Sequence, residues 1–269
     1  MLMCGYQGCF QGDATCESDE PTMTELTELA GAIRAILSRL DTRKLEVGRD
    51  PNLFGWSSAS DLNTYSPFQN ISRSDKAKVV SLAAREVELD RAMGCMCGMA
   101  VADALGHMFE FLPAIDQPDP RHSYFDAASD SFRGAKNKFR LKRGQWTDDC
   151  SMGLCIADSL LLRREFDAPD QRVRFWCWWY MGYNNAFRKE HGRSSSVGLG
   201  SNIAKSLHVL RPGVTPSPQY ESPTEDAGNG SVMRLAPIPI FFRSADREEL
   251  CARARDSSYS THPGIIAAE

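Results

Sequence analysis

A hydroxyl and two carboxylates stand next to one another at Thr147, Asp148 and Asp149. Oxygen donors gathered at one point suit a hard divalent cation such as Mg²⁺ or Ca²⁺, and not a thiol-seeking metal. A second interpretation is equally physical. Thr147 is a good N-cap for a helix, and carboxylates in a first turn interact favourably with the helix dipole. These three residues alone leave both interpretations open.

The helix that would carry these donors is predicted by the residues that follow them. Ile156, Ala157, Leu160 and Leu161 recur at helical spacing. Two more carboxylates, Asp103 and Glu110, lie in an apolar, glycine-rich helical stretch upstream, where small residues allow another backbone to approach. The usual role of an isolated acid is to cap a helix or to form a salt bridge.

A glycine-rich stretch at residues 228–234 opens an apolar segment near the end of the chain. Glycines followed by a helix expose backbone N–H groups at its positive end, which can hold a phosphate or a carboxylate. The Asn-Gly pair within it is also an ordinary turn signal. His262, just before a proline, is by itself most often structural.

The remaining pattern predicts helices and no strands, so the expected fold class is all-α. An amphipathic helix is predicted near 22–40, with an apolar stripe on one face. Loop composition follows it, and a boundary is placed near residue 80. We therefore expect an N-terminal extension at 1–80, partly disordered apart from that helix, and one domain at 81–269. Further helices are expected at 170–187, 198–210 and 246–258.

Composition narrows the class of protein. A net charge of −4 gives no electrostatic reason to expect a nucleic-acid partner. No apolar run approaching the roughly 20 residues of a membrane span is evident, and no secretory signal begins the chain. The nine cysteines include no pair of Cys-x-x-Cys knuckles, which argues against a zinc site. We expect a reduced, cytoplasmic protein without a membrane partner.

Several segments in this order resemble the ADP-ribosylglycohydrolase family, which includes the dinitrogenase-reductase-activating glycohydrolases. The similarity runs over about residues 88–269 and keeps the family's order and approximate spacing. The matching segments are 90–94, 103–106, 110–111, 144–152, 196–200, 228–237 and 261–262.

The resemblance implies a compact helical fold with a binuclear Mg²⁺ centre in a cleft. Such enzymes cleave the N- or O-glycosidic bond between ADP-ribose and a modified side chain, so an ADP-ribosylated protein or small molecule is the expected partner. By position, Thr147, Asp148 and Asp149 would bind metal, and Glu110 would orient or activate the attacking water. The residues implied to line the ADP-ribose are Gly228, Asn229, Gly230, Ser231, Met233 and His262.

The chain departs from the family pattern at three places. Ala102 stands where the family usually has glycine, and Cys150 where it has threonine. The family's C-terminal Gly-Asp-Thr/Ala-Asp-Thr motif, which supplies the lower half of the metal site, is not reached before Glu269. The expectation is therefore a fold that lacks the family's C-terminal helices, with impaired activity. The alternatives are a catalytically inactive ADP-ribose-binding or crystallin-like structural member, and a helical interaction protein.

Overall fold

The computed structural model describes residues 22–24, 27–28, 31, 72–110, 125–126, 131–132, 139–187, 196–211 and 214–269. Within these ranges the regular elements are helices, apart from the two-residue strands β1 (Phe125–Asp126) and β2 (Ser131–Phe132), which pair antiparallel. The predicted all-α class is confirmed.

The predicted N-terminal extension is only partly described. Positions 23–24, 27–28 and 31 are helical, position 22 is not, and the other positions of the predicted 22–40 helix lie outside the described residues. The predicted boundary near residue 80 falls inside a helix that begins at Arg73, and it stays a prediction.

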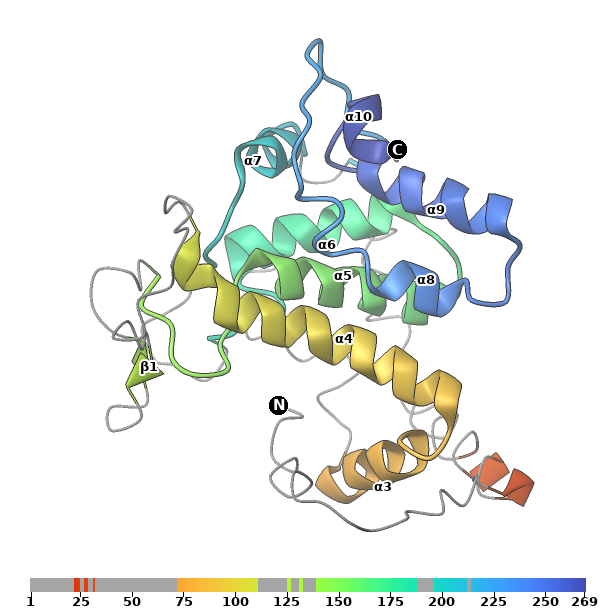
Figure 1. Cartoon of the computed structure of the whole chain (residues 1–269). Coiled ribbons are helices and arrows are strands. Elements are labelled where there is room, and N and C mark those ends of the chain that lie inside the picture. Colours follow the sequence, from red (N-terminus) through yellow and green to blue (C-terminus); the bar gives the residue numbers. More distant parts are fainter. Residues whose placement is uncertain are drawn as a thin grey trace.

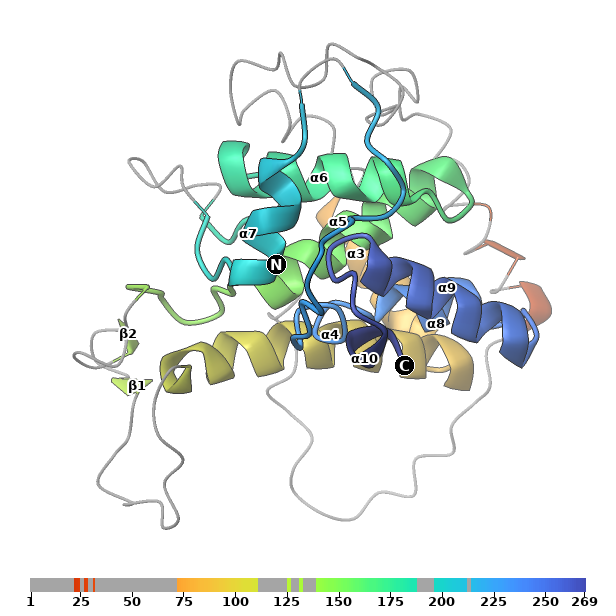
Figure 2. The same ribbon diagram turned by 90° about the horizontal axis from the view of Figure 1, so that it is seen from above.

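Four helices form a stack, which Figure 1 shows edge-on from bottom to top. Each packs against the next along the chain, and α6 also packs against α7 (Ser201–His208). Figure 2, a view from above, shows α4 running across the lower part of the view. The bounds of the stacked helices are α3 (Arg73–Ala83), α4 (Val87–Gly106), α5 (Asp148–Arg163) and α6 (Ala168–Met181).

Helix α4 is apolar, yet little of it is covered by described residues. Only Asp103 and Ala104 are buried, and an added Cβ at Gly94 or Gly98 would meet no described atom within 4 Å. The close backbone approach that its small residues predict is therefore not seen there. The segment Val87–Phe109 (23 residues, mean hydropathy 1.3) has the length and apolarity of a membrane span, contrary to the expectation from the sequence. A core helix passes the same test, and α4 packs against α3 and α5.

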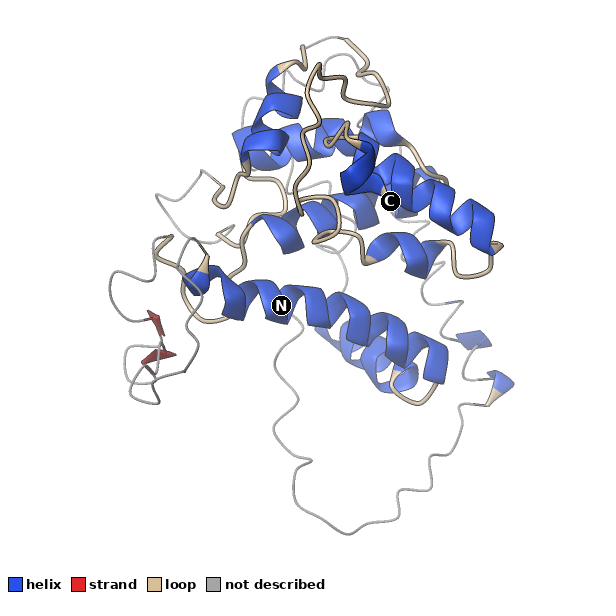
Figure 3. Ribbon diagram, turned by 45° about the horizontal axis from the view of Figure 1, so that its top comes forward, coloured by secondary structure: helices blue, strands red, loops and turns tan. Residues whose placement is uncertain are grey.

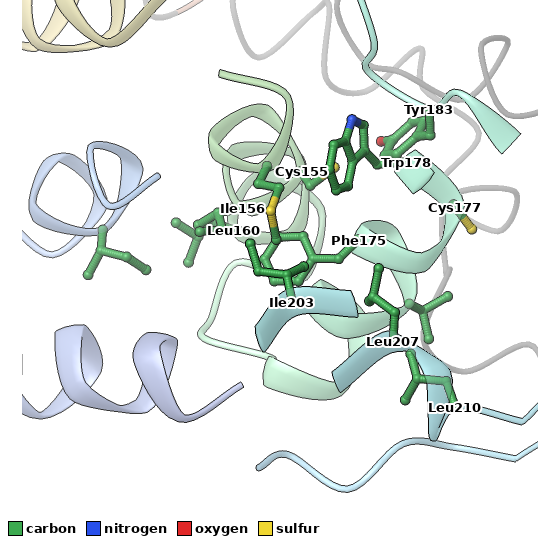
Figure 4. Close-up of a cluster of buried hydrophobic side chains, with 13 residues drawn as sticks. Cys155, Ile156, Leu160, Phe175, Cys177, Trp178, Tyr183, Ile203, Leu207 and Leu210 are labelled. Atoms are coloured by element: carbon green, nitrogen blue, oxygen red, sulfur yellow. The ribbon is translucent and has the colours of Figure 1, made fainter. Parts of the chain in front are cut away.

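The hydrophobic core lies between α5 and α6 and is completed by α7. Met152, Ile156 and Phe175 are each 0 % exposed. Figure 4 shows side chains of α5, α6 and α7 converging there. Because α5 is enclosed over most of its length, its N-terminus is held in a fixed place.

A buried polar group, here called the core cluster, lies beside these apolar side chains. Arg174 donates to Asp170 at 2.6 Å and to the hydroxyl of Tyr183 at 2.9 Å. Asp158 accepts from Tyr183 at 2.5 Å and from the side-chain amide of Asn184 at 2.9 Å. The cluster thus links α5, α6 and the turn that follows α6.

The last part of the chain folds back over α5, as Figure 3 shows. It contains α8 (Pro237–Phe241), α9 (Arg247–Tyr259) and α10 (Ile265–Ala268). The prediction that the 228–234 glycines lead directly into a helix is wrong, because that stretch forms turns up to residue 234. Helix α8 then begins at a proline, which has no N–H to offer an anion.

Candidate active site

A cavity of about 890 Å³ opens where α4, the N-terminus of α5, the N-terminus of α7 and the 228–233 loop meet. Nine of the ten predicted site residues line it, from four separate parts of the chain: Glu110, Thr147, Asp148, Asp149, Gly228, Asn229, Gly230, Met233 and His262. Ser231 is the exception. It is buried, and its hydroxyl donates to the carbonyl of Ala267 at 3.4 Å.

Asp103 of α4 anchors the start of α5. Its carboxylate accepts from the backbone N–H of Thr147 at 2.9 Å and from that of Cys150 at 2.9 Å. These are N–H groups that a helix N-terminus leaves without an intrahelical partner. Asp103, 44 residues before Thr147, therefore caps the N-terminus of α5 in place of the N-cap side chain.

Thr147 occupies the N-cap position of α5, but its side chain makes no capping hydrogen bond. Its hydroxyl instead donates to Asp103 at 2.7 Å. Because that bond uses the only hydroxyl proton, the oxygen lone pairs remain to accept a donor or to bind a cation. The capping interpretation is thus wrong for the Thr147 side chain, and the same contact favours the donor interpretation.

Asp103, Asp148 and Asp149, here called the cavity cluster, concentrate negative charge. Burial and, after it, the charge of Asp149 raise the pKa of Asp148 to about 8. The pKa of Asp149 is raised to about 6, first by burial and then by Asp103. Among the described residues no lysine or arginine forms an ion pair with any of the three. A cation would relieve this repulsion.

The oxygen donors on the cavity wall suit a divalent cation that keeps part of its water shell. No three His, Cys, Asp or Glu side chains of the described residues gather closely enough to hold a metal by themselves. Two carboxylates and the Thr147 hydroxyl remain, all of them hard oxygen donors on the cavity wall. Mg²⁺ is commonly held by one or two carboxylates and keeps several waters. The residues present fit Mg²⁺ with part of its shell supplied by water.

The backbone of Gly198 lies directly against Thr147 and Asp148 in the cavity wall. Its φ is +90°, a conformation that side chains other than glycine rarely adopt. A Cβ built there would overlap Oδ1 of Asp148 and lie 2.9 Å from the Cβ of Thr147. The backbone thus closes against the donors at a distance that only glycine allows.

Glu110 directly follows the 3-10 helix η3 (His107–Phe109), which extends α4. It is exposed and lines the cavity, and its negative charge contributes to raising the pKa of both Asp148 and Asp149. A solvated carboxylate near buried donors is suited to accept a proton from a bound water.

The 228–233 loop is held from two sides. Asp226, just before it, accepts from Lys205 of α7 at 2.8 Å and from the hydroxyls of Ser222 and Thr224 at 2.9 Å each. On the other side the imidazole of His262 packs against the glycines, since a Cβ at Gly230 would lie 2.8 Å from its Cε1. The loop glycines are therefore needed for close packing against His262.

The sequence pattern of the ADP-ribosylglycohydrolase family matches residues 84–269, which contain the whole cavity. The chain belongs to this family. It is 37 % identical over 158 residues to the ADP-ribosylarginine hydrolase Tri1 of Pseudomonas putida, a match that covers 59 % of this chain and 38 % of that protein.

Two other relatives match more distantly. The zebrafish (Danio rerio) ADP-ribosylhydrolase ARH3 is 31 % identical over 198 residues, with 68 % of this chain and 46 % of that protein covered. The ADP-ribosyl-[dinitrogen reductase] glycohydrolase of Rhodospirillum rubrum is 30 % identical over 154 residues, covering 56 % and 44 %. The chain thus matches less than half the length of each of these three relatives.

Three cavity features were not predicted as site residues. Asp103 was expected only to cap a helix or to form a salt bridge, and it does cap α5, but these partners could not be predicted because they lie far along the chain. Asn202 carried no signal at all. Gly198 was part of a matching segment, but its positive φ could not be read from the sequence. Both Gly198 and Asn202 line the cavity.

Proposed function

We propose that this chain binds ADP-ribose in the cavity and, with Mg²⁺, hydrolyses the glycosidic bond that joins ADP-ribose to a modified protein side chain. The observation that carries the proposal is the cavity cluster, which pairs with no described lysine or arginine and lines one cavity together with the glycine loop. Family membership and the names of the three relatives support the same activity.

The chain's own residues divide the work. The glycine loop lines the cavity and packs closely against His262, while Gly198 packs against Asp148. Glu110 takes a proton from the attacking water as positive charge develops on the anomeric carbon. The leaving side-chain atom regains a proton as the bond breaks.

Thr147, Asp148 and Asp149 would hold the cation. When bound, Mg²⁺ would supply positive charge that orients the ribose hydroxyls and a water. Asp103 does not need to bind it directly, since its two oxygens already accept from Thr147 and Cys150. Its role in this proposal is to fix the start of α5, and with it the three donors.

Calorimetric titration of the full chain with ADP-ribose, with and without Mg²⁺, tests the proposal. Binding should be tighter with Mg²⁺, and Asp148→Asn should remove that difference. Asp256→Asn, a partly exposed acid on α9, is the matched control and should behave as the wild type. Equal affinity of the wild type for ADP-ribose with and without Mg²⁺, or no binding by the wild type, would contradict the proposal.

A catalytically inactive ADP-ribose-binding protein is the second candidate. It is favoured by the incomplete set of metal-binding side chains among the described residues. Incubation with a protein ADP-ribosylated on arginine, in the presence of Mg²⁺, separates the two candidates. Release of ADP-ribose that is lost in Glu110→Gln supports hydrolysis, whereas Mg²⁺-sensitive binding without release supports the inactive form.

A further inference from the structure

Arg234 carries a fully buried guanidinium directly behind the glycine loop. It is 0 % exposed, and its Cζ lies 4.5 Å from the centroid of the Phe175 ring. Among the described residues no carboxylate forms an ion pair with it, although the more distant charge of Asp148 acts on it. Burying a cation without a close counter-ion is costly, so the neutral groups around Arg234 must stabilise its charge.

Those neutral groups belong to the chain just before His262. Nη2 of Arg234 lies 3.2 Å from the carbonyl oxygen of Ser257, 3.2 Å from Oγ of Ser260 and 2.6 Å from Oγ1 of Thr261. A guanidinium can only donate hydrogen bonds, so Thr261 must accept. The hydroxyl of Thr261 also lies 2.8 Å from Nδ1 of His262.

Counting protons assigns the histidine tautomer. The Thr261 hydroxyl has one proton, and among the described residues its only acceptor is Nδ1 of His262. If Nδ1 accepts that proton, the imidazole carries its own proton on Nε2. Charging the ring is disfavoured, because burial and then the neighbouring Arg234 lower the pKa of His262 to about 4.

The other ring nitrogen faces the glycine loop at the cavity wall. A Cβ built at Gly230 would lie 3.0 Å from Nε2 of His262, and one at Gly228 would lie 3.6 Å away. His262 is 2 % exposed and lines the cavity, and Nε2 has no hydrogen-bond partner among the described residues. This donor can therefore bond to a ligand or a water in the cavity.

We propose that Arg234 is a positioning residue which, through the Thr261 hydroxyl, holds His262 as a neutral imidazole protonated on Nε2. The cavity wall then presents one fixed donor, and it selects a ligand with an acceptor atom at that point. For the identity of that ligand, ADP-ribose, this inference rests on the proposed function. The tautomer itself does not depend on it.

Nitrogen NMR of histidine-labelled full-length protein at pH 7 tests the relay directly. The wild type should show a bare Nδ1 and a protonated Nε2 for His262, with His262→Gln used to assign the signal and the exposed His208 as an internal reference. Thr261→Ser should keep this pattern. Thr261→Val has the same shape without the hydroxyl, and it should lose the tautomer preference.

Affinity gives the second measurement. Thr261→Val should weaken ADP-ribose binding by about tenfold, which corresponds to about 1.4 kcal/mol, while Thr261→Ser stays close to the wild type. A wild-type His262 that is protonated on Nδ1, or charged at pH 7, overturns the proposal even if the valine variant does not fold. A folded Thr261→Val that keeps both tautomer and affinity also overturns it. Absence of ADP-ribose binding by the wild type refutes the proposed function instead, and the NMR still decides the relay.

Discussion

Helix α5 carries acidic side chains at two places, and only one of the two groups contains an ion pair with an arginine. In its middle, Asp158 belongs to the core cluster, where Arg174 and Asp170 form a direct ion pair. Although burial opposes the charge of Arg174, Asp170 raises its pKa above the usual value. At the N-terminus of α5, Asp148 is buried and Asp149 is half-buried beside Asp103, and no described lysine or arginine pairs with them.

The difference separates an acidic group that serves the fold from one that serves a ligand. The core cluster contains its own counter-charge, and it is complete in the folded chain. Among the described residues the cavity cluster is compensated by backbone N–H groups, by the Thr147 hydroxyl and by protons, so a repulsion remains that a bound cation would relieve. Opposite responses to removal of one acid are expected from the two.

Asp170→Asn should have the largest effect, a loss of about 3–5 kcal/mol in the free energy of unfolding. The substitution removes the direct ion pair between Asp170 and the buried guanidinium of Arg174. Urea unfolding measures it. Asp256→Asn, on a partly exposed pair with Arg253, is the control and should cost less than about 1 kcal/mol. A loss below about 1 kcal/mol for Asp170→Asn would end the distinction between the clusters.

Asp148 should make the wild type less stable as pH rises, when chelator removes divalent cations. Its pKa is about 8 when folded and 3.8 in its ordinary state. The folded protein therefore holds a proton between these values that the unfolded chain has released, and raising the pH lowers the free energy of unfolding until about pH 8. We expect a fall of about 2–4 kcal/mol from pH 5 to 9.

Asp148→Asn should flatten this profile and make the protein more stable than the wild type at pH 9. Urea titrations at pH 5, 7 and 9 compare the two. A wild-type profile without a slope, or an unchanged slope in the variant, would show that the cavity cluster stores no repulsion.

Gly198→Ala should cost about 1–3 kcal/mol of stability, because alanine at φ +90° is strained and its methyl group overlaps the Asp148 carboxylate. It should also abolish any Mg²⁺ effect on ADP-ribose binding. Gly144→Ala is a matched control, since that glycine also has a positive φ but its Cβ would meet no described atom within 4 Å. Gly144→Ala should lower stability without removing the Mg²⁺ effect on ADP-ribose binding. If Gly198→Ala also keeps that effect, Gly198 is not needed to shape the metal site.

Mg²⁺ should give the smallest shift in the wild type. At ten times the dissociation constant, binding to the folded state alone adds about 1.4 kcal/mol. Thermal unfolding at pH 8 with Mg²⁺ and then with chelator measures a reversible increase. Asp148→Asn should show none, and an equal increase in that variant would place the cation elsewhere.

Much of the fold follows from local pattern. The predicted helices at 170–187, 198–210 and 246–258 became α6, α7 and α9, and the apolar spacing after Asp149 became α5. The stretch at 246–258 was predicted as a charged helix. Prolines at 237 and 239 lie within the segment after the glycine loop, where only the five-residue α8 forms. Nothing in the periodicity indicated that α4 would keep most of its length uncovered by described residues.

The candidate site was predicted less evenly. Residue types located the donors at Thr147–Asp149, and resemblance to the family grouped them with the glycine loop and His262. The contacts between these parts could not be predicted, because they join residues far apart in the chain. Asp103 acts across 44 positions, and Arg234 acts on a hydroxyl 27 positions away. Single-sequence patterns carry no record of such pairs.

The bond from Asp103 to α5 has a consequence for how the protein comes into being. The carboxylate that caps α5 belongs to α4, so both helices are needed to form the cavity. The cavity therefore forms when the two helices dock. Any folding intermediate with α4 detached lacks a place for the ligand. During refolding, the onset of ADP-ribose binding would therefore report when α4 and α5 dock.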